Sequence, residues 1–279
     1  MKQTYIIGEI GINHNGDMSV VKKLIDIAAV AGFDAVKFQK RDPDKCVPEH
    51  QKQVLRQTPW GQMPYIDYKK KIELSQQQYQ EIHEYCRDKG IQWSASPWDM
   101  SSVDFLQNYD LPWVKIASAS ITDLDLVRAC AQRFKHLILS TGMSTMLDVD
   151  RAINVAREYM DDNDMTVMHC NSSYPAPVDE LNLNVISTIK QRFPGCGSGY
   201  SGHEYGLVTT MATVALGVDY VERHITLDKS MWGSDQSCSL EPHAMFKLVR
   251  GIRELELAMG SSEKTVTSSE LAKAKTLRK

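Results

Sequence analysis

Eight short apolar runs recur along this chain at a spacing of roughly thirty residues, and nearly every unusual polar residue stands at the end of one of them. Segments with the i, i+3/i+4 apolar spacing of helices follow the runs. Alternating β and α units with short connections form a parallel sheet with crossover helices, and eight such units close a barrel. The sequence therefore predicts an α/β fold, a (β/α)8 TIM barrel, in one domain over residues 1–260, followed by a polar tail over 261–279.

The element boundaries follow from the apolar periodicity. The predicted strands are Tyr5–Gly11, Ala35–Gln39, Gln92–Trp98, Trp113–Ser118, His136–Gly142, Met165–Cys170, Gly197–His203 and Tyr220–Leu227. The predicted helices are Met18–Gly32, Ser75–Lys89, Leu124–Phe134, Leu147–Tyr159, Leu183–Phe193, Val208–Gly217 and His243–Gly260. The stretch Asp42–Glu73 is predicted to be a long functional or mobile loop. The alternative fold, an open doubly wound sheet, is disfavoured because the first βα turn lacks GxGxxG.

Composition narrows the class of protein. The formal net charge of −3 and the pI near 6.2 favour neither nucleic acid nor an anionic membrane as a partner. The chain starts with no secretion signal, and no apolar stretch reaches the 18 or so residues of a membrane-spanning helix. Its six cysteines are scattered without CxxC pairing. We therefore expect a cytoplasmic protein with reduced thiols.

His203 and His224 end two neighbouring predicted strands. Neutral imidazole suits Mn²⁺, Fe²⁺ or Zn²⁺, and two such ligands leave positions on the ion open for a substrate. The alternative is a pair of hydrogen-bonded histidines in the barrel interior.

Lys37 and Lys115 end the second and fourth predicted strands, each among apolar neighbours. A buried lysine needs an anion beside it. Three explanations stay open: a clamp for a phosphate or carboxylate, an internal salt bridge to Glu9 or Glu222, and a Schiff-base lysine.

Hydroxyl and carboxyl groups complete the strand ends. Hydroxyls suited to oxyanion binding are offered by Ser96, Ser118, Ser140, Thr141 and Ser201. Glu9 and Asp235 are the best acid/base candidates, followed by Glu222. The aromatic residues Trp60, Tyr65 and Tyr68 in the long loop serve either as packing or as a substrate lid.

Several of these motifs together resemble one family. The matching segments, in order, are Glu9–Gly16, Val36–Gln39, Lys115–Ser118, Ser140–Met143, His169–Pro175, Ser201–His203 and Glu222–His224. The pattern resembles the catalytic barrel of the N-acetylneuraminate (sialic acid) synthase family, which includes legionaminate and pseudaminate synthases. The likeness runs from about Tyr5 to Gly260.

The resemblance implies a reaction and a set of binding residues. The family condenses phosphoenolpyruvate with an open-chain aldose into a 3-deoxy-ulosonic acid and releases phosphate, as a carbon–carbon bond-forming transferase that serves surface polysaccharide synthesis. By resemblance, His203 and His224 hold a divalent metal, most often Mn²⁺, and Glu9 and Asp235 lie near the metal and the sugar. The residues implied for phosphoenolpyruvate are Lys37, Ser96, Lys115, Ser118, Ser140, Asn171 or Ser172, Tyr174 and Ser201.

The chain departs from the family pattern at three positions. Ser120 stands where sialic acid synthases carry a glutamate that helps to hold the amino sugar, which puts N-acetylmannosamine in doubt as the substrate. Gly202 replaces the usual Asp before the histidine, and Phe38 replaces the usual His before Gln39. The family's C-terminal antifreeze-like domain would begin near Lys279, so the resemblance covers the barrel without that domain. Barrel-to-barrel packing into a homo-oligomer is expected.

Two other functions are weighed against this one. A 3-deoxy-octulosonate-phosphate-type synthase, acting on a phosphorylated aldose, needs a second basic cluster, for which Lys40 and Arg41 are the evident candidates. A non-catalytic barrel predicts the loss of a metal ligand or a clamp lysine, and all four are present.

Overall fold

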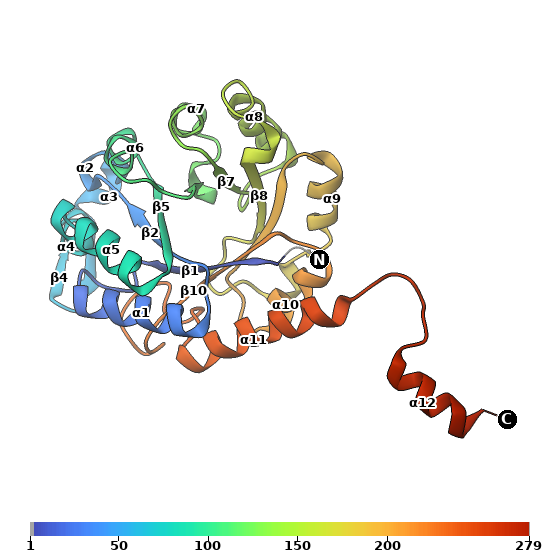
Figure 1. The fold of residues 1–279 in the computed structure, drawn as a ribbon. Helices are drawn as coiled ribbons and strands as arrows, with labels where there is room; N and C mark the ends of the chain where they lie inside the picture. Colours follow the sequence, from blue (N-terminus) through green and yellow to red (C-terminus); the bar gives the residue numbers. More distant parts are fainter. Residues whose placement is uncertain (1–2, 279) are drawn as a thin grey trace.

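The chain forms a nearly closed parallel barrel surrounded by helices (Figure 1) in a computed structural model that describes residues 3–278. The barrel strands are β1 (Tyr5–Gly11), β2 (Ala35–Lys40), β5 (Gln92–Pro97), β6 (Val114–Ile116), β7 (Leu137–Ser140), β8 (Met165–Cys170), β9 (Gly197–Gly202) and β10 (Tyr220–His224). Their hydrogen-bonded order is β5-β2-β1-β10-β9-β8-β7-β6, and β5 lies beside β6 where the barrel closes. The predicted eight-stranded barrel is confirmed.

Helices follow the strands and cover the outside of the barrel (Figure 1). They are α1 (Met18–Ala31), α5 (Gln76–Lys89), α6 (Met100–Leu106), α7 (Leu124–Arg133), α8 (Met146–Ala156), α9 (Val185–Arg192), α10 (Val208–Ala215) and α11 (Pro242–Met259). Short 3₁₀ turns are η1 (Ser118–Ser120), η2 (Asp162–Asp164) and η3 (Val178–Glu180). The periodicity located every one of these α-helices except α6, which makes only two turns. Helix α6 begins after its N-cap residue Asp99, whose side chain accepts a hydrogen bond from the Ser102 amide.

The sequence predicted a long irregular loop after β2, and this prediction was wrong. The segment contains the short helices α2 (Pro43–Cys46) and α3 (Glu49–Lys52), the hairpin of β3 (Leu55–Thr58) with β4 (Gly61–Pro64), and α4 (Tyr65–Ile72). Tyr68 and Ile72 pack on Ile12 in a small apolar cluster of their own. A short apolar cluster therefore orders this insertion over residues 42–73, which has too few apolar residues for its periodicity to be visible in the sequence.

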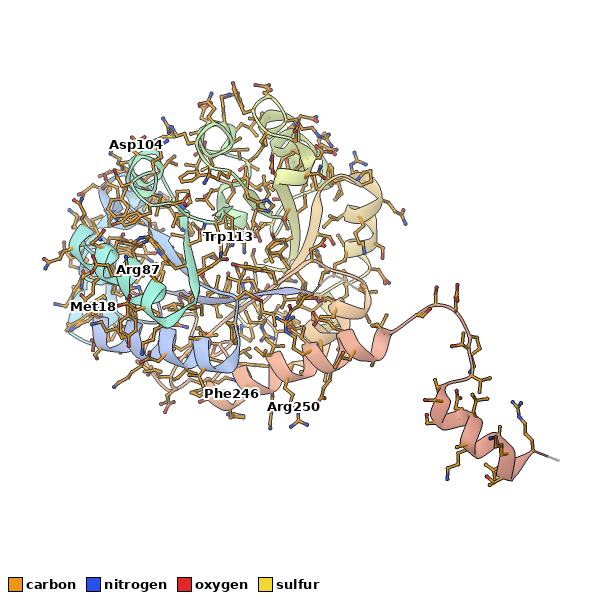
Figure 2. All side chains as sticks on the ribbon, viewed as in Figure 1. Met18, Arg87, Asp104, Trp113, Phe246 and Arg250 are labelled. Atoms are coloured by element: carbon orange, nitrogen blue, oxygen red, sulfur yellow. The ribbon has the colours of Figure 1, made fainter. Side chains whose placement is uncertain are left out.

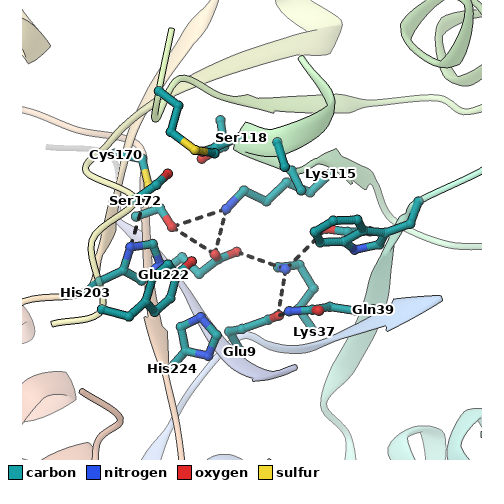
Figure 3. Close-up of a pocket in the computed structure, with 18 residues that line it drawn as sticks. Glu9, Lys37, Gln39, Lys115, Ser118, Cys170, Ser172, His203, Glu222 and His224 are labelled. Carbon is teal, nitrogen blue, oxygen red and sulfur yellow. Dashed lines mark hydrogen bonds and ion pairs between the residues drawn. The ribbon is translucent and has the colours of Figure 1, made fainter. Parts of the chain in front are cut away.

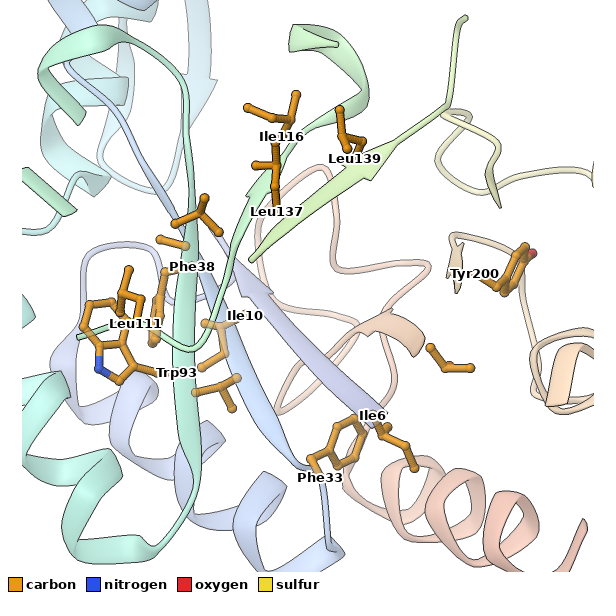
Figure 4. Packing of buried hydrophobic residues seen from close by; sticks show 14 of the residues in the cluster. Ile6, Ile10, Phe33, Phe38, Trp93, Leu111, Ile116, Leu137, Leu139 and Tyr200 are labelled. Atoms are coloured by element: carbon orange, nitrogen blue, oxygen red, sulfur yellow. The ribbon is translucent and has the colours of Figure 1, made fainter. Parts of the chain in front are cut away.

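The largest core lies between the strands and the helices. Phe38 points outward from β2 into this layer, where its ring meets Tyr79 and Trp93 edge-on at centroid distances of 6.3 and 6.2 Å. Figure 4 shows Phe38 beside Trp93, Leu111 and Ile10. Phe38 is therefore a packing residue.

A second, smaller apolar layer fills the barrel itself. Its residues are Ile7, Ala35, Trp113, Ile138 and Met168, with Tyr5 and Tyr220 packed against it. Figure 2 places Trp113 inside the barrel, whereas Arg87, Asp104 and Arg250 project from the outer helices. Successive side chains of a strand alternate in direction, so the inward-facing residues two positions later are the polar ones. The apolar layer closes one end of the barrel and leaves the polar residues at the other.

The tail carries one more helix, α12 (Ser268–Leu277), which lies apart from the barrel in Figure 1 and has no buried residue. A capping box of Thr267 and Glu270 starts it. None of the helices in residues 3–278 combines the length and the apolar character needed to cross a bilayer.

Candidate active site

A cavity of about 250 Å³ opens above the inner apolar layer, at the carboxyl ends of the strands (Figure 3). Twelve of the predicted site residues line it, namely Glu9, Lys37, Ser96, Lys115, Ser118, Ser140, Ser172, Tyr174, Ser201, His203, Glu222 and His224. Each of these on a strand stands at or near its carboxyl end, so that parallel strands bring them to one mouth.

Lys115 is held by the strand on the opposite wall of the cavity. Its Nζ lies 2.6 Å from Glu222 Oε1 and 3.2 Å from Ser201 Oγ, and the Ser201 hydroxyl donates to the same carboxylate oxygen at 2.9 Å. All three side chains are buried. Burial opposes the charge on Glu222, but Lys115 and Lys37 more than offset it and lower its pKa to about 2. Glu222 is therefore a buried anion that pairs directly with the Lys115 side chain.

Lys37 belongs to the same buried network. Its Nζ lies 2.6 Å from Glu9 Oε2, 3.7 Å from Glu222 Oε2 and 3.3 Å from Ser96 Oγ. Gln39 donates to the other Glu9 oxygen at 2.8 Å. Burial and the neighbouring Glu222 raise the pKa of Glu9, although Lys37 opposes this. The internal salt bridges that the sequence left open for both lysines are thus present, and Glu9 is the carboxyl group of the pair that takes up a proton more readily.

His203 and His224 face the cavity side by side, with ring centroids 5.4 Å apart. The Nδ1 of His203 is 2.6 Å from the Asn171 carbonyl, which leaves its Nε2 free of that contact. The Nδ1 of His224 is buried without a hydrogen-bond partner, and burial lowers the pKa of this ring to about 3. A divalent metal binds neutral imidazole, the form that burial favours for His224, and the carbonyl contact fixes the orientation of the His203 ring.

Carboxylate and thiol groups do not complete a cage around the two rings. In residues 3–278 no group of three or more His, Cys, Asp and Glu side chains is arranged to hold a metal ion. Asp235 Oδ2 lies 3.9 Å from His224 Nδ1 and does not line the cavity. An ion here would have two protein ligands and open positions for water or substrate, as in an open catalytic site.

Ser118 and Ser172 meet at Gly142, where the chain approaches them closely. The Gly142 amide donates to Ser118 Oγ at 3.0 Å, and a Cβ at Gly142 would overlap Ser172 Oγ and come within 2.8 Å of Ser118 Oγ. Ser140 Oγ is buried and has no hydrogen-bond partner among the described residues. Hydroxyl groups that lack protein partners are available to an oxyanion.

Two further candidates lie outside the cavity: Asn171, which the resemblance implied, and Thr141, one of the strand-end hydroxyls. The Asn171 side chain is turned to a neighbouring cavity, where it donates to the Glu180 carbonyl at 3.2 Å and accepts from the Ser173 amide at 2.9 Å. What Asn171 brings to the site is its carbonyl, which holds His203. Thr141 also lines the neighbouring cavity and donates to the Met168 carbonyl at 3.0 Å.

Six lining residues were not singled out as site residues, namely Gln39, Trp98, Ala117, Ala119, Met143 and Cys170. Gln39 follows Lys37 by two positions on one strand, so alternation alone placed it on the same side. No pattern in the sequence indicates Met143, which has a φ of +60° in a loop.

The structure explains one departure from the family pattern and locates another. At Gly202, an added Cβ would lie 2.6 Å from Glu204 Oε2 and 3.0 Å from Arg223 Cδ. Glu204 is a fully buried carboxylate paired with Arg223, so it occupies the space of a side chain at position 202. Ser120 is buried in η1 and does not line the cavity, whereas Ala119 does.

A parallel barrel with a charged, largely buried cavity at the carboxyl ends of its strands has the architecture of a barrel enzyme. The chain belongs to the NeuB family, which it matches over residues 24–264. The family predicted from the motifs is thereby confirmed.

Named relatives agree with this assignment. The chain is 37% identical over 282 residues to N,N'-diacetyllegionaminic acid synthase of Campylobacter jejuni, covering 100% of this chain and 84% of the relative. It is 39% identical over 256 residues to N-acetylneuraminate-9-phosphate synthase of Drosophila melanogaster, covering 91% and 68%. The solved N-acetylneuraminic acid synthetase of Leptospira borgpetersenii, in complex with citrate, superposes with a TM-score of 0.86 at 27% identity, over 100% of this chain and 93% of that one. The predicted enzyme class, an ulosonic acid synthase, is confirmed.

Proposed function

We propose that this protein condenses phosphoenolpyruvate with an open-chain aldose in a metal-dependent reaction, forming a 3-deoxy-ulosonic acid and releasing phosphate. The observation that carries the proposal is the convergence of Lys37, Lys115, His203 and His224 on one cavity. An anion clamp beside an open metal site is what the joining of an anionic enol phosphate to a sugar aldehyde requires.

The two lysines bind the phosphoenolpyruvate anion. Each lysine is paired with a buried carboxylate in a site that is shielded from water. When the substrate enters, its phosphate and carboxylate oxygens share the lysine N–H donors with Glu9 and Glu222, because each ammonium has three. The hydroxyl groups of Ser118 and Ser140, which also line the cavity, supply further donors.

Glu9 is the residue proposed to move a proton. It is fully buried, its pKa is raised, and it lies against Lys37 rather than in solvent. A carboxyl group with a raised pKa is suited to general acid/base work near neutral pH. Glu9 then takes a proton from the water that adds to the former enol carbon, and the loss of phosphate follows. We propose that Asp235, 3.9 Å from His224 Nδ1, assists at the sugar.

We propose that His203 and His224 hold Mn²⁺. When bound, a divalent ion polarises the aldehyde oxygen and makes its carbon electrophilic. Tyr174 packs its ring on His203 at a centroid distance of 4.0 Å and so keeps that imidazole in place.

The test is phosphate release from phosphoenolpyruvate with Mn²⁺ and a panel of aldoses that includes N-acetylmannosamine, mannose and arabinose. Release that depends on one sugar and is abolished in His203→Ala is the expected result. Release that is independent of any sugar, or that persists in His203→Ala, would contradict the proposal.

A further inference from the structure

A second cavity, of about 280 Å³, lies between the insertion after β2 and the loop after β10. It is lined by Ile12, Arg56, Gln57, Tyr65, Tyr68, Lys69, Trp232 and Ser234. Tyr68 meets the Trp232 ring edge-on at a centroid distance of 5.1 Å, which joins the insertion to the loop. The cavity has aromatic walls and two cationic residues, and none of its lining residues lines the active-site cavity.

The cations in this cavity rest on aromatic rings and have no carboxylate partner. Lys69 Nζ lies 5.3 Å from the Tyr65 centroid and 5.5 Å from that of Tyr68, and the Arg56 guanidinium lies 5.4 Å from Tyr65. Within residues 3–278, no Asp or Glu oxygen is within 4.0 Å of either cation. The neighbouring Lys70, in contrast, is exposed and pairs with Asp44 at 2.7 Å.

A third cation, Arg41, strengthens the positive field. Arg41 is buried, with its guanidinium 4.2 Å from the Trp98 centroid. Burial and the charge of Arg41 together lower the pKa of Lys69 to about 8, while Asp235 and Glu73 act in the opposite direction. The positive charge available to an incoming anion comes mainly from Arg56 and Lys69, which line the cavity.

Uncharged hydrogen-bond donors face the same space. The phenol oxygens of Tyr65 and Tyr68 have no hydrogen-bond partner among residues 3–278, and burial raises the pKa of both groups, which keeps them protonated. Two phenols, a guanidinium and an ammonium around one cavity match the many acceptor oxygens of a phosphate.

The loop after β10 links the wall of this cavity to the histidines of the active site. Ser234, in its wall, donates to Asp235 Oδ1 at 2.6 Å, and the other oxygen of Asp235 lies 3.9 Å from His224 Nδ1. A sugar with its aldehyde at the histidines and its hydroxyls along Asp235 would therefore point its far end at Lys69 and Arg56.

We propose that this cavity binds a phosphomonoester on the terminal carbon of the acceptor aldose. The inference rests on the proposed condensation and assigns the substrate class: an open-chain aldose phosphate in place of a neutral sugar. The two cations in the cavity wall, Arg56 and Lys69, match a phosphate dianion better than the single charge of a carboxylate. The basic cluster is built by Arg56 and Lys69 of the insertion, with Arg41, and not by Lys40, which is paired with Glu73.

The experiment compares matched pairs of acceptors with the full chain and Mn²⁺. The pairs are arabinose with arabinose 5-phosphate, and N-acetylmannosamine with its 6-phosphate, and the rate is the loss of the ultraviolet absorbance of phosphoenolpyruvate. The wild type is expected to have the higher kcat/KM on the phosphorylated member of at least one pair. In Lys69→Met or Arg56→Met that preference should fall about ten- to a hundredfold, as for the loss of one charged hydrogen bond. The control, Lys70→Met, removes an adjacent charge outside the cavity and should keep the preference.

Equal kcat/KM on both members of each pair, or an equal loss on both in Lys69→Met, would overturn the assignment while the condensation stands. If no acceptor supports turnover, the condensation fails and titration calorimetry decides the cavity separately. Binding of arabinose 5-phosphate but not arabinose, lost in Lys69→Met and kept in Lys70→Met, supports a phosphate site. The absence of such binding overturns it.

Discussion

The ammonium of Lys115 and the carboxylate of Glu222 lie 2.6 Å apart at the centre of the active-site cavity, and both side chains are almost completely buried. A second pair, Lys22 and Glu81, has the same separation on the surface of the molecule. Burial should make the two pairs very different in their contribution to stability, because water screens the surface pair and leaves the buried one unscreened.

The first prediction concerns Lys115→Met. Removing the lysine takes the closest countercharge from the buried Glu222 and leaves it only Lys37, at 3.7 Å, so the free energy of unfolding in urea should fall by about 3–5 kcal/mol. Lys22→Met, which breaks the surface pair, should leave the free energy of unfolding nearly unchanged. The double variant Lys115→Met/Glu222→Gln should recover most of the stability without recovering condensation. Equal losses of stability in the single and double variants would refute this account of the pair.

The second prediction concerns metal binding. Mn²⁺ at a hundred times its dissociation constant should raise the free energy of unfolding by about 2.7 kcal/mol, since the ion binds the folded state alone. A chelator should reverse the effect, and His203→Ala or His224→Ala should remove it. His50 is exposed in the insertion, so His50→Ala should respond to Mn²⁺ as the wild type does. An unchanged response in His224→Ala would place the ion elsewhere.

The third prediction concerns Gly142→Ala. The new methyl group would overlap Ser172 Oγ and crowd Ser118 Oγ, which forces one wall of the cavity to move. Overpacking of this kind costs about 1–3 kcal/mol in stability, and we expect a lower affinity for phosphoenolpyruvate as well. Adding Ser172→Ala removes the closest overlap and should restore much of the stability, which thermal unfolding can measure. If Gly142→Ala unfolds at the wild-type temperature, the wall is not closely packed.

The fourth prediction concerns the pH dependence of stability through His14. Burial lowers the pKa of this histidine to about 4. As pH falls from about 6.5 to about 4, the unfolded chain takes up the proton first, so folding loses about 3 kcal/mol from this group alone. Above pH 6.5 the contribution is fully present.

The measurement is urea unfolding of the wild type and His14→Gln at several pH values. Glutamine keeps an acceptor for the Gly16 amide, which now donates to His14 Nδ1 at 2.9 Å. As the pH falls over that range, the unfolding free energy of the wild type should therefore decrease by about 3 kcal/mol relative to that of His14→Gln. A difference that is constant with pH would mean that His14 is protonated in the folded protein.

Much of the fold could be predicted from the sequence because its signals are local. Apolar runs, helical periodicity and the spacing between them gave eight strands and all but one of the α-helices around the barrel. The short helix α6 was not predicted because its seven residues are too few to show a helical periodicity. The structure of the insertion was not predicted because its hairpin and α4 are held by packing on Ile12, in the turn after β1, and not by a pattern of their own.

The sequence by itself determined the barrel, the family and the set of strand-end residues that face one cavity, because alternation along a parallel strand places inward-facing side chains two residues apart. Only the tertiary structure decided how those residues are paired. It joined Lys115 to Glu222 and Lys37 to Glu9, turned the Asn171 side chain away, and set Glu204 in the space beside Gly202. It also brought Lys69 and Trp232 to one cavity. These contacts join residues that are far apart in the chain, and their geometry depends on the packing of the whole barrel.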